Sequence, residues 1–242
     1  MDAVGTNDVV LDIGGWADPL WRADWVMDLA PYETRGLYER NGWVAPHDLS
    51  KERFGPETWI TRDICDREPY PFDDKSIDFV VCSHTLEDIR DPVWVCSEMQ
   101  RIAKAGYIEV PSRLEEQTWG IHGDFVGWVH HRWLIDIDRD AMEFVFKLHA
   151  IHANPRFYFP ASFAGRLSDD DRVQSLWWKG SFDVSERVMF EEEEATNVYL
   201  GEFVSAQLAA RGLRPEPAPR STLRRARSAG KRLTRLLHRA AR

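Results

Sequence analysis

The first 112 residues predict an α/β fold with a mostly parallel sheet, because short apolar runs of strand length alternate there with helix-like stretches. Consecutive parallel strands need crossover connections, so this alternation places helices against the sheet. The chain has 242 residues, which is enough for one sizeable core. No apolar run reaches the ~18 to 20 residues that a membrane-spanning helix needs.

Five strands are predicted in this half from their apolar pattern, over residues 9–13, 25–29, 59–63, 79–82 and 107–110. One helix is well marked between the last two strands. Asp91 can cap it, Pro92 fits its first turn, and Gly106 is predicted to end it. The three cysteines have no metal-ligand spacing and are predicted to be reduced core thiols.

The second half contains aromatic-rich strand candidates that we expect to run antiparallel, over residues 131–138, 142–148, 176–179 and 184–191. A helix is predicted over residues 197–211, closed by Gly212. We interpret residues 1–210 as one domain, with a β-rich insertion at about 113–180, rather than as two independent domains.

Residues 211–242 form a tail whose charge is opposite to that of the body. The tail holds eleven of the 31 Lys and Arg residues but one acidic residue, so its net charge is near +10, and the remaining 20 basic and 39 acidic residues give the body about −19. We expect either a flexible terminus or a weak membrane-surface contact through a basic amphipathic helix. The acidic body argues against nucleic-acid binding, and the lack of a signal peptide predicts a cytoplasmic protein.

Small and acidic residues at the strand ends predict a nucleotide-like cofactor site. The first strand runs into Gly14 and Gly15, which let a ligand approach the backbone. Asp28 ends the second strand, where a carboxylate can accept hydrogen bonds from both ribose hydroxyls, and Asp63 ends the third beside Ile64. Neither a dinucleotide glycine fingerprint nor a Walker lysine is present, which argues against NAD and ATP.

Residues 9–112 resemble the class I methyltransferases of the type 11 kind. The segments that carry the resemblance are VLDIGG for motif I, WVMDL for the ribose strand, TRDICD for the adenine loop, YPFDDKSIDFVVCSHTLEDIRDP for motif IV and GYIEVPS for the fifth strand. The resemblance implies a Rossmann-like fold with a central, mostly parallel seven-stranded sheet and an antiparallel last strand. It also implies that S-adenosylmethionine is the cofactor and that residues 113–180 lie on the acceptor side.

The resemblance also implies where the parts of the cofactor bind. The two glycines would approach its methionine part, Asp28 its ribose, and Asp63 with Ile64 its adenine. The expected cofactor-binding residues are Asp12, Gly14, Gly15, Trp16, Asp28, Leu29, Asp63, Ile64, Ser83 and His84, the last two beside the sulfonium. Three departures from the family stand out: the run Trp16-Ala17-Asp18-Pro19 replaces the usual third glycine of motif I, the first crossover is too short for a full helix, and Asp88 stands where a histidine is common.

Histidines interleaved with tryptophans after the fifth strand predict an acceptor site. A hydroxyl acceptor needs a base of near-neutral pKa, for which histidine is best suited. The candidate bases are His122, His130, His131 and, from motif IV, His84. The faces of Trp119, Trp128 and Trp133 suit the apolar faces of sugar rings, so we favour a saccharide O-methyltransferase.

A resemblance to sugar methyltransferases of actinobacterial polysaccharide pathways makes a mannoside or related hexose the specific expectation. Two alternatives stay open: a methyltransferase for a lipid or small aromatic acceptor, and a non-catalytic methyltransferase-like partner module. Mg²⁺ is an alternative activator of the hydroxyl, although no ligand set has clear metal-binding spacing, and we therefore assign no residue as a metal ligand. A homodimer is expected only because dimers are common.

Overall fold

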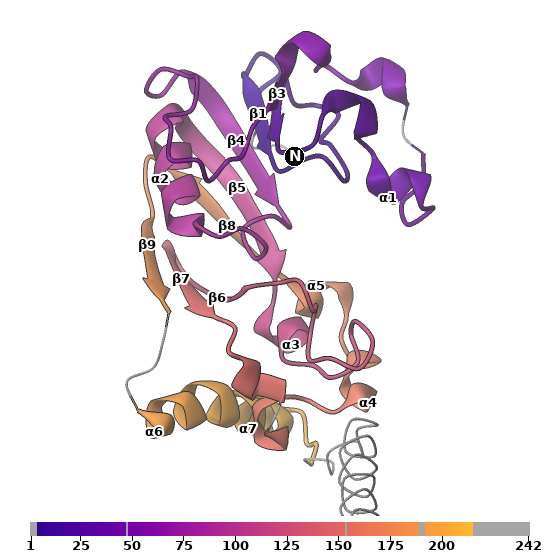
Figure 1. Ribbon diagram of the computed structural model, residues 1–242, viewed down its shortest axis with the longest axis vertical. Coiled ribbons are helices and arrows are strands. Elements are labelled where there is room, and N and C mark those ends of the chain that lie inside the picture. Colours follow the sequence, from indigo (N-terminus) through magenta and orange to yellow (C-terminus); the bar gives the residue numbers. More distant parts are fainter. Residues whose placement is uncertain (1–3, 47, 153, 189–191, 215–242) are drawn as a thin grey trace, which may run out of the picture.

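The computed structural model describes residues 4–46, 48–152, 154–188 and 192–214, and Figure 1 shows their arrangement. The expectations for the basic tail beyond residue 214 lie outside the described residues. The described strands form two sheets, a larger one built mostly from the first half of the chain and a smaller one from the second half. The predicted α/β class is confirmed.

The larger sheet has six strands in the order β3-β2-β1-β4-β5-β8. Their bounds are Val10–Ile13 for β1, Trp25–Asp28 for β2, Trp59–Thr61 for β3, Ile77–Ser83 for β4, Ala103–Pro111 for β5 and Val173–Lys179 for β8. The first five are parallel, and β8 pairs antiparallel with β5 at the edge, as expected. Six described strands form this sheet rather than seven, because the other strands of the second half pair with one another instead.

The smaller sheet has the order β6-β7-β9, with β6 at Trp133–Asp138, β7 at Ala141–Phe146 and β9 at Asp183–Arg187. Strands β6 and β7 form the predicted antiparallel hairpin, but β9 runs parallel to β7, so the expectation for this strand was wrong. The chain reaches β9 only after crossing the larger sheet in β8. The Asp183 amide then donates to the Asp140 carbonyl, which aligns the start of β9 with the start of β7.

The predicted central helix is α2, at Pro92–Ile102, and the Asp91 carboxylate caps it by accepting from the Trp94 amide at 3.2 Å. Its end was predicted too late, because Gly106 lies inside β5. A Cβ at Gly106 would come within 2.7 Å of Val80, so glycine is required there by close packing between strands. The helix covers one face of the larger sheet (Figure 1).

The remaining helices are short. They are α1 at Leu37–Arg40, α3 at Arg113–Glu116, α4 at Ala161–Ala164, α5 at Asp169–Arg172, α6 at Glu193–Thr196 and α7 at Phe203–Ala210, with a π-helical stretch at Asn197–Glu202 and 3-10 turns at Tyr32–Thr34, Leu49–Lys51, Pro56–Thr58, His149–His152 and Pro155–Phe157. The C-terminal helix predicted over residues 197–211 is confirmed, and it starts earlier, at α6. No helix lies between β1 and β2, as the short first crossover predicted.

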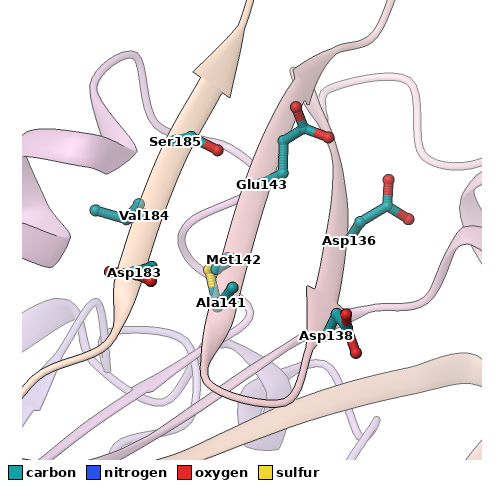
Figure 2. A pocket seen from close by; sticks show the side chains of 8 residues that line it. All are labelled: Asp136, Asp138, Ala141, Met142, Glu143, Asp183, Val184 and Ser185. Carbon is teal, nitrogen blue, oxygen red and sulfur yellow. The ribbon is translucent and has the colours of Figure 1, made fainter.

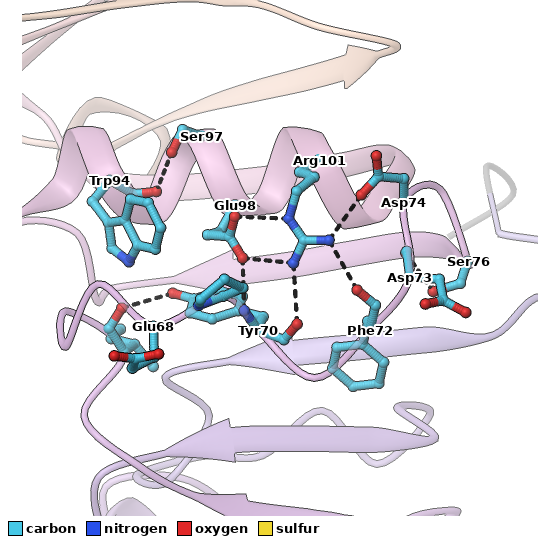
Figure 3. Close-up of polar contacts among 12 residues, drawn as sticks. Glu68, Tyr70, Phe72, Asp73, Asp74, Ser76, Trp94, Ser97, Glu98 and Arg101 are labelled. Carbon is cyan, nitrogen blue, oxygen red and sulfur yellow. Dashed lines mark hydrogen bonds and ion pairs between the residues drawn. The ribbon is translucent and has the colours of Figure 1, made fainter.

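Arg101 of α2 fixes the loop that leads into β4, as Figure 3 shows. Its guanidinium donates to the carbonyls of Tyr70 and Phe72 at 3.0 and 2.9 Å and binds both carboxylate oxygens of Glu98 at 2.8 and 2.7 Å. Glu98 is buried and also accepts from the Tyr70 amide at 2.7 Å. Because a buried carboxylate is costly without partners, this network holds the motif IV loop on the helix.

The main core lies between the larger sheet and α2 and contains Cys65, Cys82 and Cys96, which are free and buried as predicted. Within the described part of the chain, no helix combines the length and the apolar composition needed to cross a bilayer.

Candidate functional site

The carboxyl ends of β1 and β4 touch at the glycine pair. Gly14 has a φ of +81°, and a Cβ there would overlap the side chain of Thr85, two residues after β4. A Cβ at Gly15 would overlap the Asp12 carboxylate. Both glycines are therefore required by packing at the strand ends, at the edge of the sheet where α/β proteins bind nucleotides.

Asp12 is 3% exposed and holds the turn that follows β1. Its Oδ2 atom accepts from the Leu20 amide at 2.8 Å. Burial raises the pKa of Asp12 to about 7, against the opposing effect of that hydrogen bond, and the nearby negative charge of Asp28 raises it further. The residue organises the loop from inside the protein.

Asp28 and Trp16 form the exit from β2. The Asp28 carboxylate accepts from the amides of Trp16 and Ala30 at 3.2 and 2.8 Å, and burial raises its pKa in spite of these bonds. Each carboxylate oxygen has a second lone pair, so Asp28 can still accept hydrogen bonds from a ligand. Leu29 is 70% exposed beside it, and the Trp16 indole donates to the Thr34 carbonyl at 2.7 Å.

The two predicted adenine residues have different surroundings. Asp63 lies near the surface and pairs with Arg90 at 2.6 Å, and this hydrogen bond lowers the pKa of Asp63. The Ile64 side chain packs in the main core, and its carbonyl accepts from the Tyr70 hydroxyl at 2.9 Å. No local sequence pattern indicated the Arg90 contact, since 27 residues separate the partners.

His84 follows β4 with a φ of +49°, a conformation that histidine adopts more readily than most residues. Its Nε2 atom lies 3.4 Å from Glu109 and its Nδ1 atom 3.6 Å from Glu87. The carboxylates of Glu109 and then Glu87 raise the pKa of His84 to about 10, so the ring is protonated at neutral pH. Ser83 donates to the same Glu109 carboxylate at 3.3 Å. The two glutamates were not among the predicted site residues.

Two of the predicted base candidates, His130 and His131, gather around Asp88 just beyond the end of β4. Nε2 of His130 and Nε2 of His131 each lie 3.9 Å from a different carboxylate oxygen of Asp88. We refer to Asp88, His130 and His131 as the Asp88 cluster. The main chain holds it in place, because the Arg132 amide donates to the Glu87 carbonyl at 2.7 Å and the Trp133 indole to the Ile89 carbonyl at 2.8 Å.

Behind the cluster, Glu116 binds His131 and Lys147. Its Oε1 atom lies 2.6 Å from Nδ1 of His131 and its Oε2 atom 2.6 Å from the Lys147 ammonium. Burial opposes ionisation of Glu116, but the His131 hydrogen bond and the Lys147 charge together lower its pKa. A Cβ at Gly127 would overlap the Glu116 carbonyl, so glycine is required for the loop to close over this carboxylate.

Trp128 and His122 complete the aromatic surroundings of the cluster. The Trp128 ring stacks on His131 at a centroid distance of 5.9 Å and lies 5.4 Å from His122. His122 is exposed, and its ring is 5.8 Å from that of His130. The other two predicted tryptophans are elsewhere: Trp119 packs on Tyr158, and Trp133 is buried in the main core.

A shallow hollow in the smaller sheet is a separate feature. Figure 2 shows its lining by residues of β6, β7 and β9, namely Asp136, Asp138, Ala141, Met142, Glu143, Asp183, Val184 and Ser185. None of these residues belongs to the predicted cofactor or acceptor sites. The hollow lies on the smaller sheet, whereas the glycine pair follows β1 of the larger sheet.

The family model of the methyltransferase domain matches residues 44–108, which include Asp63, Ser83, His84 and Asp88. No curated protein matches the chain significantly.

Three solved structures illustrate what the chain is similar to. The complex of the Haloferax volcanii Trm112 methyltransferase activator with a methyltransferase shares 21% identity at a TM-score of 0.30, over 44% of this chain and 46% of that one. A SAM-dependent methyltransferase from Aquifex aeolicus shares 16% identity at a TM-score of 0.29, over 43% of this chain and 55% of that one. The third structure is a Haemonchus contortus phosphoethanolamine N-methyltransferase bound to phosphomonomethylethanolamine and S-adenosylhomocysteine. It shares 20% identity at a TM-score of 0.33, over 45% of this chain and 25% of that one.

The similarity therefore spans about half of the first two structures and a quarter of the third. The family of the matched domain uses S-adenosylmethionine as its cofactor. Residues 44–108 match a methyltransferase domain of the S-adenosylmethionine-dependent class, and they lie within an α/β Rossmann-like fold.

Proposed function

We propose that the protein transfers the methyl group of S-adenosylmethionine to a hydroxyl of a saccharide. The acceptor oxygen attacks the methyl carbon as the carbon–sulfur bond breaks, and the electron pair of that bond passes to sulfur. The hydroxyl proton passes to a base. The observation that carries this proposal is the position of the Asp88 cluster, four residues beyond His84, which the family resemblance assigns to the sulfonium side.

The acidic groups around the strand ends support binding of a cationic cofactor. Asp12 and Asp28 lie at the ends of β1 and β2, and Glu87 is buried just after β4. Among the described residues, the Oε2 atom of Glu87 is buried without a hydrogen-bond partner. A positive sulfonium at this edge of the sheet would reduce the cost of these carboxylates, and the exposed Leu29 offers an apolar surface beside Asp28.

The histidines differ in their suitability as the base. His84 is disfavoured, because a ring with a pKa of about 10 already carries a proton at neutral pH. The proposal therefore places the base among His122, His130 and His131, which stand together around Trp128. His84 instead contributes a positive charge held between Glu87 and Glu109.

The saccharide acceptor is supported by the mixture of groups in this region. Trp128 supplies an aromatic ring, and the histidines with Asp88 supply hydrogen-bonding groups for hydroxyls. The exposed ring of His122 extends the same surface, 5.4 Å from the Trp128 ring. A mannoside or related hexose oligosaccharide is the specific acceptor that we propose.

Transfer of a labelled methyl group from S-adenosylmethionine tests the proposal. The acceptors to compare are a mannoside oligosaccharide, a phospholipid vesicle and a small catechol, each with the wild-type protein and with Asp28→Ala. Labelling of the mannoside alone, lost in Asp28→Ala, is expected. Labelling of the lipid or the catechol alone would overturn the saccharide assignment. Cofactor binding without labelling of any acceptor would favour a non-catalytic module.

A further inference from the structure

The Asp88 cluster has the composition of a metal site. It contains two imidazoles and one carboxylate, and the three candidate donor atoms lie within 4.8 Å of one another. The two histidines are adjacent in sequence, and their rings are nearly perpendicular, at 84°, so both can point a nitrogen at one position. We propose that Asp88, His130 and His131 bind a divalent transition-metal cation.

The distances between the donor atoms are close to those around a bound cation. Each histidine Nε2 lies 3.9 Å from an Asp88 oxygen, too far for a hydrogen bond. Donors around a tetrahedral zinc ion, at 2.0 to 2.1 Å from it, are separated by about 3.4 Å. The two histidine–carboxylate distances exceed this value by about 0.5 Å, and all three donor atoms lie within 4.8 Å of one another, so small side-chain movements would bring them around one cation.

One of the proposed ligand atoms also has no hydrogen-bond partner in the described part of the protein. The Oδ1 atom of Asp88 is buried and accepts no hydrogen bond there. Burial of a carboxylate oxygen without a partner is unfavourable, and a cation between Asp88 and the two imidazoles would supply the missing interaction. Arg132 does not supply it, because its Nε atom donates to the main-chain carbonyl of Asp88 at 2.9 Å.

Glu116 provides the support that metal-binding histidines require. Its carboxylate lies 2.6 Å from Nδ1 of His131, so the neutral tautomer that carries its hydrogen on Nδ1 bonds to Glu116 and leaves Nε2, which faces Asp88, free to bind a cation. Such carboxylate–histidine contacts fix the tautomer and the ring orientation of metal ligands. Lys147 in turn holds the other oxygen of Glu116 at 2.6 Å, so the support is itself fixed.

The donor set indicates the class of cation. Imidazole suits Zn²⁺, Co²⁺ and Fe²⁺, whereas Mg²⁺ prefers carboxylates, carbonyls and water. Two histidines and one carboxylate also leave coordination positions free for water or a substrate oxygen, as in catalytic zinc sites. We therefore expect Zn²⁺ or Co²⁺ to bind more tightly than Mg²⁺, in contrast to the magnesium alternative that the sequence left open.

The consequence for methyl transfer rests on the proposed function, although the binding of the cation does not. Ligation of His130 and His131 leaves His122, whose ring lies 5.8 Å from that of His130, as the histidine available to take the hydroxyl proton. The cation would orient the acceptor and favour loss of that proton. The bonds made and broken, oxygen to methyl carbon and methyl carbon to sulfur, are unchanged.

Titration of the chelator-treated full-length protein with Co²⁺ tests the site without an activity assay. One equivalent of Co²⁺ is expected to give visible absorption bands that Zn²⁺ removes and that Mg²⁺ does not. Asp88→Asn and His130→Gln are expected to weaken binding by about tenfold or more. His152→Gln is the matched control, because this histidine lies outside the cluster and contributes none of the proposed ligand atoms.

Two results would overturn the metal site: no saturable binding to the wild-type protein, or equal affinity in wild-type, Asp88→Asn and His130→Gln. Circular dichroism confirms that each variant is folded. Calorimetric titration of the same samples with S-adenosylhomocysteine separates the two proposals. Metal binding without cofactor binding would contradict only the proposed function, and cofactor binding without metal binding would contradict only the metal site.

Discussion

The Glu116 carboxylate joins the ring of His131 to the ammonium of Lys147, with both contacts at 2.6 Å and all three side chains buried. The partners come from α3, from the segment before β6 and from the end of β7. This contact ties the helix that follows β5 to the smaller sheet. It is therefore a structural link between the two halves of the chain, and it supports the proposed acceptor side.

Removing the charge of Glu116 is expected to destabilise the protein. Glu116→Gln leaves Lys147 charged and buried, which should lower the free energy of unfolding by about 3 kcal/mol. Urea unfolding followed by circular dichroism measures this. Glu143→Gln removes the carboxylate of a more exposed pair with Arg187 and should cost less than about 1 kcal/mol. The double variant Glu116→Gln/Lys147→Met should recover part of the loss. Equal effects of the two single variants would contradict this account.

A side chain at Gly14 is expected to disturb the turn that follows β1, where we propose that the cofactor binds. Gly14→Ala combines the cost of a positive φ, about 1 to 2 kcal/mol, with overlap against Thr85. Gly36→Ala is the matched control, because Gly36 has a φ of +75° and open space around it. Thermal unfolding should show a clearly larger loss for Gly14→Ala. If both variants lose the same stability, Gly14 is required only for its backbone conformation.

The buried carboxyl of Asp12 predicts a pH dependence of stability. Its pKa is raised from 3.8, the ordinary value, to about 7 in the folded protein, so the folded state binds this proton more tightly than the unfolded state does. The resulting stabilisation is fully present below pH 3.8 and is lost as pH rises through 7. Asp12→Asn lacks this titration. The stability of the variant relative to wild type should therefore increase between pH 4 and pH 7, by a few kcal/mol at most. Urea unfolding across this range checks the trend, and a constant difference would contradict it.

His84 is expected to remain protonated well above neutral pH. Its contacts with Glu109 and Glu87 raise its pKa to about 10. NMR titration of the ring C–H signals, assigned by comparison with His84→Gln, should show its transition above pH 9. The exposed His122 provides an internal comparison in the same spectra. A transition of His84 near pH 6.5 would show that the two glutamates do not hold the ring and would restore it as a candidate base.

Local patterns in the sequence were sufficient to predict the first half of the fold. Apolar runs identified β1 to β5, the Asp91–Pro92 pair marked the start of α2, and the 15 residues from Asp12 to Asp28 predicted the missing first helix. The glycine pair was predictable from its position directly after the first strand, although the contact of Gly14 with Thr85 spans 71 residues and was not.

The contacts that organise the candidate site were not predictable from local patterns. Asp63 and Arg90 are 27 residues apart, and Asp88 meets His130 and His131 across more than 40 residues. Their pairing depends on how the second half packs against the end of β4, which no periodicity describes. The parallel pairing of β9 with β7 has the same origin, since the chain first crosses the larger sheet.

Calorimetric titration with S-adenosylhomocysteine, for wild type and for Asp28→Ala, tests the central claim most directly. We expect one binding site for S-adenosylhomocysteine in the wild-type protein and its loss in Asp28→Ala, with the circular dichroism spectrum of the variant unchanged. Absence of binding to the wild-type protein would contradict a functional cofactor site at the ends of β1 and β2.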